Sequence, residues 1–150
     1  MTGLRFKVAR LEEELGLVDA RLRRVLEDMN LYTEAALGYP LTVTEILGGA
    51  GVHSEHRGAD VRSKDLPGSA PDPRTGLVDP ASFAYELRDW TNGRWGYGRT
   101  NAATGRKYAV VVFGDNDVSR KHEDHFHVQV PPPRILLADL RLDLARVRLA

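Results

Sequence analysis

Residues 125–130 alternate strictly between polar and apolar side chains, and this alternation restricts how that part of the chain can fold. Phe126, Val128 and Val130 occupy every second position, with His125, His127 and Gln129 between them. Successive side chains of a strand point to opposite faces, so we expect the apolar set in the core and the histidine pair on the other face. The sequence therefore predicts a half-buried strand whose polar face carries two neighbouring imidazoles.

All five histidines of the chain fall within two short segments. Three lie in residues 122–127, and the other two, His53 and His56, lie in residues 52–60; both segments also carry carboxylates. Histidines that only fill core or surface positions would be scattered, whereas imidazoles gathered with carboxylates are typical of a metal or acid–base site. The alternative interpretation of residues 122–127 is a solvated, charged end of a hairpin.

The composition restricts the class of protein. A chain of 150 residues is long enough for one domain, which we expect to have its core at about residues 18–130 and a C-terminal extension at 134–150. The 21 basic and 21 acidic residues cancel, which removes the bulk electrostatic argument for nucleic-acid binding. The sequence contains no run of about 18 apolar residues and therefore predicts no membrane-spanning helix. Because cysteine is absent, nitrogen and oxygen atoms would hold any metal.

The order of helical and extended patterns predicts an α+β fold in which a small antiparallel sheet carries the site. Hydrophobic spacing, caps and β-branched runs predict helices over residues 4–16, 19–37 and 79–91, and strands over residues 41–47, 59–62, 108–113 and 125–130. Residues 64–76, rich in proline and glycine, are expected to form a surface loop.

Two segments leave alternatives open. The glycine- and aromatic-rich residues 92–99 fit either a binding loop or a connection with packed aromatic side chains. Residues 136–150 fit a helix better than a strand, and this helix would pack on the domain or on a second copy in a homodimer.

The two histidine segments together resemble a known family. His53 is followed seven residues later by Asp60, and Asp124 stands three residues before His127. This pattern resembles the zinc peptidases of the D-alanyl-D-alanine carboxypeptidase and L-alanyl-D-glutamate endopeptidase group, which cut peptidoglycan stem peptides. The spacing of His122, His125 and His127 is similar to the murein endopeptidase branch, and the His-x-His pair also to the Hedgehog signalling domain of the same fold.

The chain departs from that family around the first motif. Gly51, His56 and Gly58 stand where the family usually has serine, glycine and alanine, and Gly48 and Gly49 replace an arginine. The resemblance therefore covers the metal set better than the residues that bind substrate. Candidate replacements for the missing cation are Arg57, Arg94 and Arg99.

The resemblance implies a zinc (Zn²⁺) site held by His53, Asp60 and His127. Two imidazoles and one carboxylate are a common catalytic zinc set, which leaves the fourth position for water. Such a zinc ion lowers the pKa of water toward about 7 and polarises a peptide carbonyl.

Four neighbours of the last ligand, and one of the first, are the candidate catalytic and supporting residues. Asp124 is the expected general base and Glu123 its rival, although strict alternation would place Asp124 on the face opposite His127 unless the chain turns or bulges there. His125 is expected to stabilise the oxyanion or to share the proton transfer. His122 and His56 are expected beside the ligands or the substrate, with exposed polar positions as the alternative.

The resulting hypothesis is a zinc-dependent peptidoglycan peptidase, of the kind found in phage endolysins, that hydrolyses an amide of the stem peptide. Because the family's arginine is absent, an endopeptidase cut between L-alanine and D-glutamate is slightly favoured over carboxypeptidase activity. The basic start of the chain precedes no apolar segment, so we expect no signal peptide and a protein made in the cytoplasm that acts on the wall after release. The alternative function is a non-catalytic, zinc-bound interaction domain of the same fold.

Overall fold

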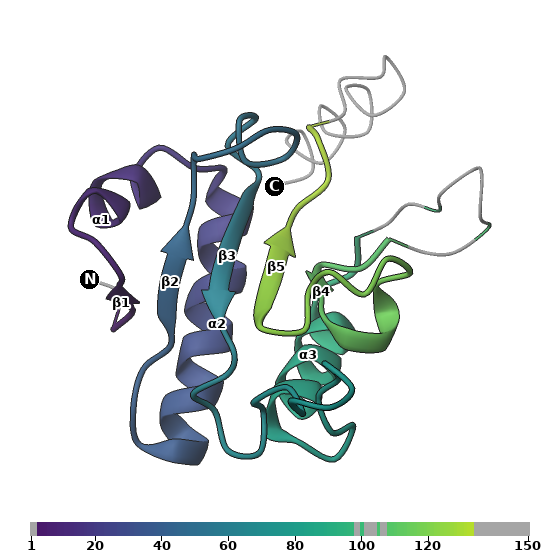
Figure 1. The fold of residues 1–150 in the computed structure, drawn as a ribbon. Coiled ribbons are helices and arrows are strands. Elements are labelled where there is room, and N and C mark those ends of the chain that lie inside the picture. Colours follow the sequence, from purple (N-terminus) through teal and green to yellow (C-terminus); the bar gives the residue numbers. More distant parts are fainter. Residues whose placement is uncertain (1–2, 98–99, 101–104, 106–107, 134–150) are drawn as a thin grey trace, which may run out of the picture.

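The computed structural model describes residues 3–97, 100, 105 and 108–133, which form an α+β fold (Figure 1). Its elements in chain order are β1 (Arg5–Phe6), α1 (Arg10–Leu15), α2 (Ala20–Leu37), β2 (Thr42–Glu45), β3 (Gly58–Arg62), α3 (Phe83–Arg94), β4 (Val111–Val112), the short 3-10 helix η1 (Gly114–Asn116) and β5 (His125–Gln129). The strands form one mixed sheet in the order β1-β2-β3-β5-β4. The predicted α+β class is confirmed, and the segment 134–150, with its expected helix, lies outside the described residues.

The sheet is antiparallel except at β1, which runs parallel to β2. The prediction of a wholly antiparallel sheet is therefore wrong at this strand, and so is the prediction of one helix over residues 4–16. Arg5 N donates to Leu41 O at 2.8 Å, and α1 begins only at Arg10. The backbone groups along the outer edge of β2 need partners, and residues before α1 supply them.

α2 has the bounds that its sequence predicts. The Asp19 side chain accepts a hydrogen bond from Arg21 N at 2.9 Å, which caps the first turn. At the other end Gly38 has a left-handed backbone (φ 79°), and its N–H donates to Glu34 O at 2.9 Å. Glycine adopts this conformation without a steric penalty, which explains why the helix ends there.

α3 lies further along the chain than predicted. The helix expected over residues 79–91 spans Phe83–Arg94 instead. Asp79 does not cap it, because its side chain accepts from Ala81 N at 2.9 Å in a turn that precedes the helix. The first residues of the expected loop 92–99 form the last turn of α3.

β4 is shorter than the predicted strand over residues 108–113. The Asn92 side chain pairs with the backbone of Val111, accepting from its N–H at 2.8 Å and donating to its carbonyl at 3.0 Å. A side-chain amide of α3 thus takes the place of another strand at this edge of the sheet. Residues 64–76 contain no helix or strand, as predicted.

One face of the sheet is buried and the other carries polar side chains. α2 lies against the first face (Figure 1), and Val61, Phe126 and Val128 on this side are fully buried. Phe126 packs on Phe113 with ring centroids 5.0 Å apart. Because strand side chains alternate, this burial fixes which residues of β3 and β5 remain on the opposite face.

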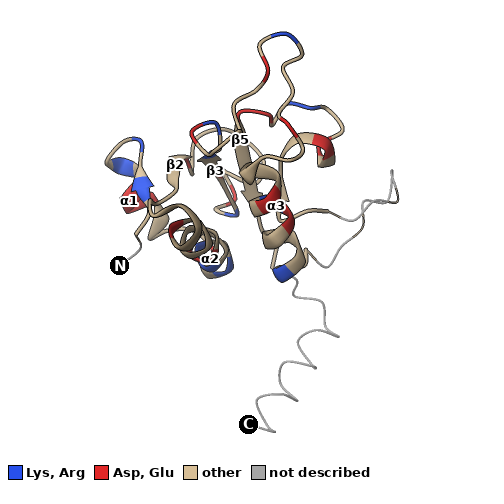
Figure 2. Cartoon of the chain, turned by 90° about the horizontal axis from the view of Figure 1, so that it is seen from below, with Lys and Arg blue, Asp and Glu red and all other residues tan. Residues whose placement is uncertain are grey.

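Acidic and basic side chains are interspersed over the described surface. Figure 2 shows both signs on α2, which agrees with the balanced net charge. Within the described part of the chain, no helix is both long and apolar enough to cross a membrane.

Phe126→Ala is expected to destabilise the protein by about 3–5 kcal/mol, since it removes a fully buried aromatic side chain from between the sheet and its helices. Val118→Ala is the control, because Val118 is 75% exposed and its truncation should change the unfolding free energy by less than about 0.5 kcal/mol. Urea unfolding of the three proteins measures both values. Equal losses in the two variants would contradict the assigned strand face.

Candidate metal centre

The pairing of β3 with β5 brings two of the predicted ligands together. Their antiparallel register sets Asp60 directly opposite His127 and Arg62 opposite His125. These four side chains share the polar face, since Val61 and Phe126 between them point into the core. Directly opposite residues have Cβ atoms about 4.5–5.5 Å apart, within reach of a common ion.

His53 comes from the loop between β2 and β3, and a backbone carbonyl fixes its ring. Its Nδ1 lies 2.7 Å from Ile46 O, so this nitrogen donates the ring proton. Nε2 then carries the free lone pair, and it lies 3.4 Å from Asp60 Oδ1. Hydrogen bonding of one ring nitrogen to a carbonyl is the usual arrangement for a metal-binding histidine.

The loop around His53 packs closely against Gly58. A Cβ atom on Gly58 would lie 2.6 Å from Val52 Cγ2, closer than side-chain carbons approach one another. An alanine at this position would therefore require Val52 to move. Gly58 is a consequence of how tightly this loop packs against the start of β3.

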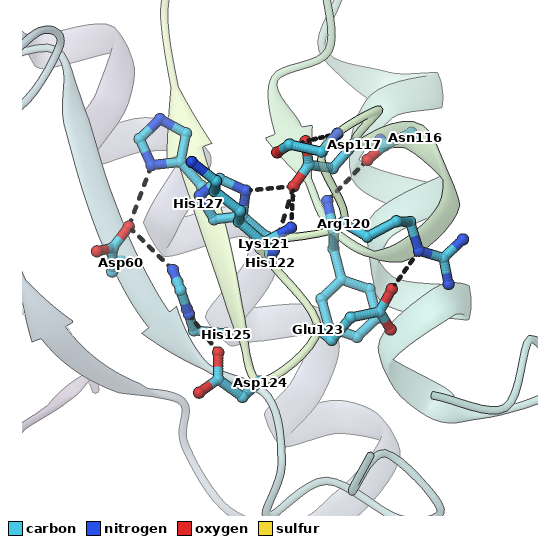
Figure 3. A network of polar contacts seen from close by, with 12 residues as sticks. Asp60, Asn116, Asp117, Arg120, Lys121, His122, Glu123, Asp124, His125 and His127 are labelled. Carbon is cyan, nitrogen blue, oxygen red and sulfur yellow. Dashed lines mark hydrogen bonds and ion pairs between the residues drawn. The ribbon is translucent and has the colours of Figure 1, made fainter. Parts of the chain in front are cut away.

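The three predicted ligands present two nitrogens and one oxygen to a common point (Figure 3 shows Asp60 and His127). Their ligand atoms lie within 4.8 Å of one another, and His127 Nδ1 is 3.1 Å from Asp60 Oδ1. In tetrahedral zinc sites with bonds of 2.0–2.1 Å, ligand atoms are about 3.3 Å apart. The two distances to Asp60, 3.1 and 3.4 Å, agree with that spacing.

The electrostatics of the group favour a cation. Burial alone would raise the pKa of Asp60, but hydrogen bonds to His127 and His53 outweigh it and hold the pKa well below its usual value. The hydrogen bond with Asp60 in turn raises the pKa of His53. Asp60 is thus a carboxylate at every physiological pH, and without a metal it favours a proton on His53.

Two further histidines flank the ligands, and each is held by a carboxylate (Figure 3). His125 Nδ1 lies 2.7 Å from Asp124 Oδ1, and its Nε2 is 3.9 Å from Asp60 Oδ1. His122 Nδ1 lies 2.8 Å from Asp117 Oδ2. The ring of His122 is 5.0 Å from that of His125. The predicted residues His122 and His125 are therefore next to the ligand group.

Asp117 is the residue of this site that sequence reasoning missed. The pKa of Asp117 is about 2: burial raises it, but hydrogen bonds from Ser119, His122 and the backbone of Lys121 outweigh that effect. The sequence gives one weak signal, an aspartate two residues before a serine, which predicts a local turn rather than a partner for His122. The contact exists only because residues 114–122 fold back, with Gly114 N donating to His122 O at 2.8 Å.

The two carboxylates proposed for the base role occupy different environments. β5 begins at His125, so Asp124 precedes the strand and does not follow its alternation of side-chain direction. The Asp124 side chain is 65% exposed and accepts a hydrogen bond from His125. Glu123 is buried, with one oxygen accepting from Val78 N at 3.0 Å and the other 2.6 Å from Arg120 Nε. Asp124 reaches the ligand group through His125, whereas Glu123 faces away from it.

The remaining candidates lie elsewhere. His56 Nδ1 is 3.0 Å from Leu17 O, near the start of α2, so the structure does not bring this ring to the ligands. Arg57 is bound to Glu55 and to the carbonyl of Val130, and Arg94 pairs with Asp28. Neither is free to bind a substrate next to Asp60, and Arg99 lies outside the described residues.

Comparison with known proteins finds no matching family model, no matching curated protein and no matching solved structure. The assignment of the ligands therefore depends on the geometry of this chain and on the motif spacing.

We expect His53→Ala to lower zinc affinity by more than the roughly 10–100-fold that loss of a supporting hydrogen-bond partner causes, because it removes one of three ligands. His56→Ala is the matched control: the same substitution three residues away, at a ring that contacts Leu17 instead of Asp60. Elemental analysis and competition with a zinc chelator give the stoichiometry and affinity. Equal zinc binding by the two variants would show that His53 is not a ligand.

Zinc affinity should also fall as the pH is lowered through neutrality. A protonated imidazole cannot bind a metal, and since the pKa of His53 is raised above its ordinary value of about 6.5, protonation competes with zinc from above that pH downward. Asp60, with its lowered pKa, stays ionised over this interval and does not contribute to the loss. Chelator competition between about pH 8 and pH 6 tests this, and an affinity independent of pH would exclude histidine ligands.

Proposed function

We propose that this protein is a zinc-dependent peptidase that hydrolyses an amide bond of the peptidoglycan stem peptide. The observation that carries the proposal is the group of His53, Asp60 and His127 on the polar face of the sheet, with their ligand atoms within 4.8 Å of one another. Three protein ligands with a fourth position open are typical of catalytic zinc, whereas structural zinc usually has four protein ligands. The choice of stem peptide depends on the motif resemblance.

The arrangement of the ligands also supports the proposed fold relationship. A histidine before β3, an aspartate on β3 and a final histidine on β5 occur in the order that the Hedgehog and D-alanyl-D-alanine peptidase fold implies. The small sheet with α2 on its other face is compatible with that fold. We propose this relationship on the basis of the ligand positions.

When bound, a zinc ion would polarise the scissile carbonyl and lower the pKa of the attacking water toward about 7. The residues of the chain would then have to accept the proton of that water and deliver it to the leaving amine. Two imidazoles stand next to the ligand group for this purpose, His125 and His122.

We assign the base role to His125 and Asp124 acting as a pair. His125 Nε2 points toward Asp60, while Nδ1 is bound to Asp124 Oδ1 at 2.7 Å. The carboxylate fixes the ring orientation and stabilises the imidazolium that forms when Nε2 takes a proton. The sequence predicts Asp124 itself as the general base; in this proposal Asp124 takes part in the proton transfer through the neighbouring ring.

His122 is suited to a different step of the reaction. Asp117 holds its Nδ1 at 2.8 Å, so that Nε2 is left for the substrate. The ring lies 5.2 Å from that of His127, on the side of the ligand group nearer β4. In its protonated form, a histidine held in this way can donate from Nε2 a hydrogen bond to the developing oxyanion or a proton to the leaving nitrogen.

The proposed reaction is tested by incubating purified sacculi with the protein and following the products by mass spectrometry. We expect zinc-dependent release of muropeptides cut within the stem, with the bond between L-alanine and D-glutamate slightly preferred. His53→Ala should abolish release and His56→Ala should not. Full zinc occupancy without cleavage of any wall type would refute the peptidase and favour the zinc-bound interaction domain.

The roles of Asp124 and Glu123 can be distinguished by replacing each carboxylate with the corresponding amide. Asp124→Asn should lower the hydrolysis rate by about tenfold to 100-fold, as expected for loss of a partner that orients a histidine. His125→Ala should lower it by about 10²–10⁴-fold, as expected for loss of the proton acceptor itself. Glu123→Gln should have little effect, since Glu123 faces Val78 and Arg120.

All three variants should bind zinc as the unmodified protein does, because none of these residues belongs to the ligand group. Rates from peptide hydrolysis and zinc contents from elemental analysis are compared for each variant. A large loss in Glu123→Gln together with full activity in Asp124→Asn would reverse the assignment of the two carboxylates.

A further inference from the structure

A small cavity lies directly beside the ligand group and is not used by the chemistry described above. It encloses about 220 Å³, and the residues around it include Lys7, Asp60, Arg62, Lys64, Asp124 and His125. Pockets for drug-sized ligands enclose about 300–1,000 Å³, so this cavity suits a single side chain or a terminal group. Because Asp60 and His125 form part of its wall, a group bound there would be next to the scissile bond.

The strand register determines which side of the ligand group the cavity occupies. Arg62 lies two residues after Asp60 on the same face of β3, about 7 Å further along the strand. It is directly opposite His125 on β5. Lys7 comes from the segment that follows β1, and Lys64 from the loop that follows β3. The cavity therefore extends toward β1 and β2, away from His122 and β4.

The charges around the cavity favour an anion. Lys7, Arg62 and Lys64 bring three cations, whereas Asp124 is bound to His125 and Asp60 faces His53 and His127. With a divalent metal held by Asp60, the balance around the cavity would be strongly positive.

Few carboxylates of the protein itself compete with a bound ligand for these three cations. In the described part of the chain, the only carboxylate within 4.0 Å of any of them is Asp65, with Oδ2 at 3.9 Å from an Arg62 terminal nitrogen. The side chains of Arg62 and Asp65 are 35% and 50% exposed, and such a long, exposed ion pair contributes little free energy. The guanidinium can exchange this contact for a bound carboxylate at small cost.

We propose that this cavity is a subsite that binds a carboxylate of the substrate next to the scissile amide, with Arg62 as the main specificity-determining residue. A guanidinium binds a carboxylate through two parallel hydrogen bonds, and Lys7 and Lys64 add positive charge. This inference rests on the proposed peptidase function, whose substrate it narrows to peptides with an acidic residue or a free C-terminus at that point.

The test uses three peptides that differ only in their carboxylates. They are acetyl-L-alanyl-D-glutamyl-L-alanine amide, the D-glutaminyl counterpart with a C-terminal amide, and the D-glutaminyl counterpart with a free C-terminus. Each is titrated into the zinc-loaded protein and followed by NMR, which reports binding through shifts and hydrolysis through product signals. The variants are Arg62→Gln, Lys64→Gln and, as the control of equal charge change, Arg24→Gln on the exposed side of α2.

We expect the unmodified protein to bind at least one carboxylate peptide about tenfold or more tightly than the neutral peptide, as charge-assisted hydrogen bonds imply. Arg62→Gln should reduce this preference to less than about twofold, Lys64→Gln should reduce it in part, and Arg24→Gln should leave it unchanged. Preference for the D-glutamyl amide would identify an internal carboxylate, and preference for the free C-terminus a terminal one; either supports the subsite.

Equal binding of the three peptides, or a preference that persists in Arg62→Gln, would overturn the proposal, and the second outcome would indicate that zinc alone attracts the carboxylate. If Arg62→Gln fails to fold, Lys64→Gln decides, since that side chain is exposed. The experiment can refute the peptidase function and the carboxylate subsite independently of each other. Binding that depends on Arg62 without any product would refute the peptidase and leave the subsite, whereas hydrolysis without preference would refute only the subsite.

Discussion

The antiparallel pairing of β3 with β5 is the contact on which the rest of the structure depends. It sets Asp60 opposite His127 while directing Val61 and Phe126 into the core. If the pairing register shifted by one residue, every side chain of the shifted strand would point to the other face. On β3, Asp60 would then point into the core and Val61 to the polar face. The free energy that holds the register therefore comes from the burial of apolar side chains, and the grouping of the candidate metal ligands is a consequence of that burial.

Asp60 is the electrostatic centre of the polar face. Three imidazoles surround its Oδ1 at 3.1, 3.4 and 3.9 Å, from His127, His53 and His125. A half-buried carboxylate with these neighbours requires positive charge, which either protons or a metal can supply. Each outer histidine has its own carboxylate, Asp124 for His125 and Asp117 for His122, and the hydrogen bond to it fixes the orientation of the ring.

The two sides of the ligand group differ in chemistry, which gives the site a direction. Toward β4 lies an imidazole suited to proton transfer, and toward β1 and β2 lies a small cationic cavity. In the proposed function, a peptide bound across the sheet would meet His122, the proposed proton donor, on one side and Arg62, the proposed carboxylate-binding residue, on the other. Arg62 and Asp60 lie close together because side chains two residues apart on one strand point to the same face.

The sequence by itself determined the α+β class, α2 and the strand with its histidine pair, because these follow from local periodicity. The three residues that the structure brings together were expected from the motif resemblance. The sequence could not determine the start of α3 or the parallel β1, where packing and unpaired strand edges override local preference. Only the tertiary structure separated Glu123 from Asp124, which adjoin in sequence but face opposite environments, and joined Asp117 to His122. The cavity around Arg62 likewise needed the fold, since only the sheet brings Lys7 close to Arg62 and Lys64.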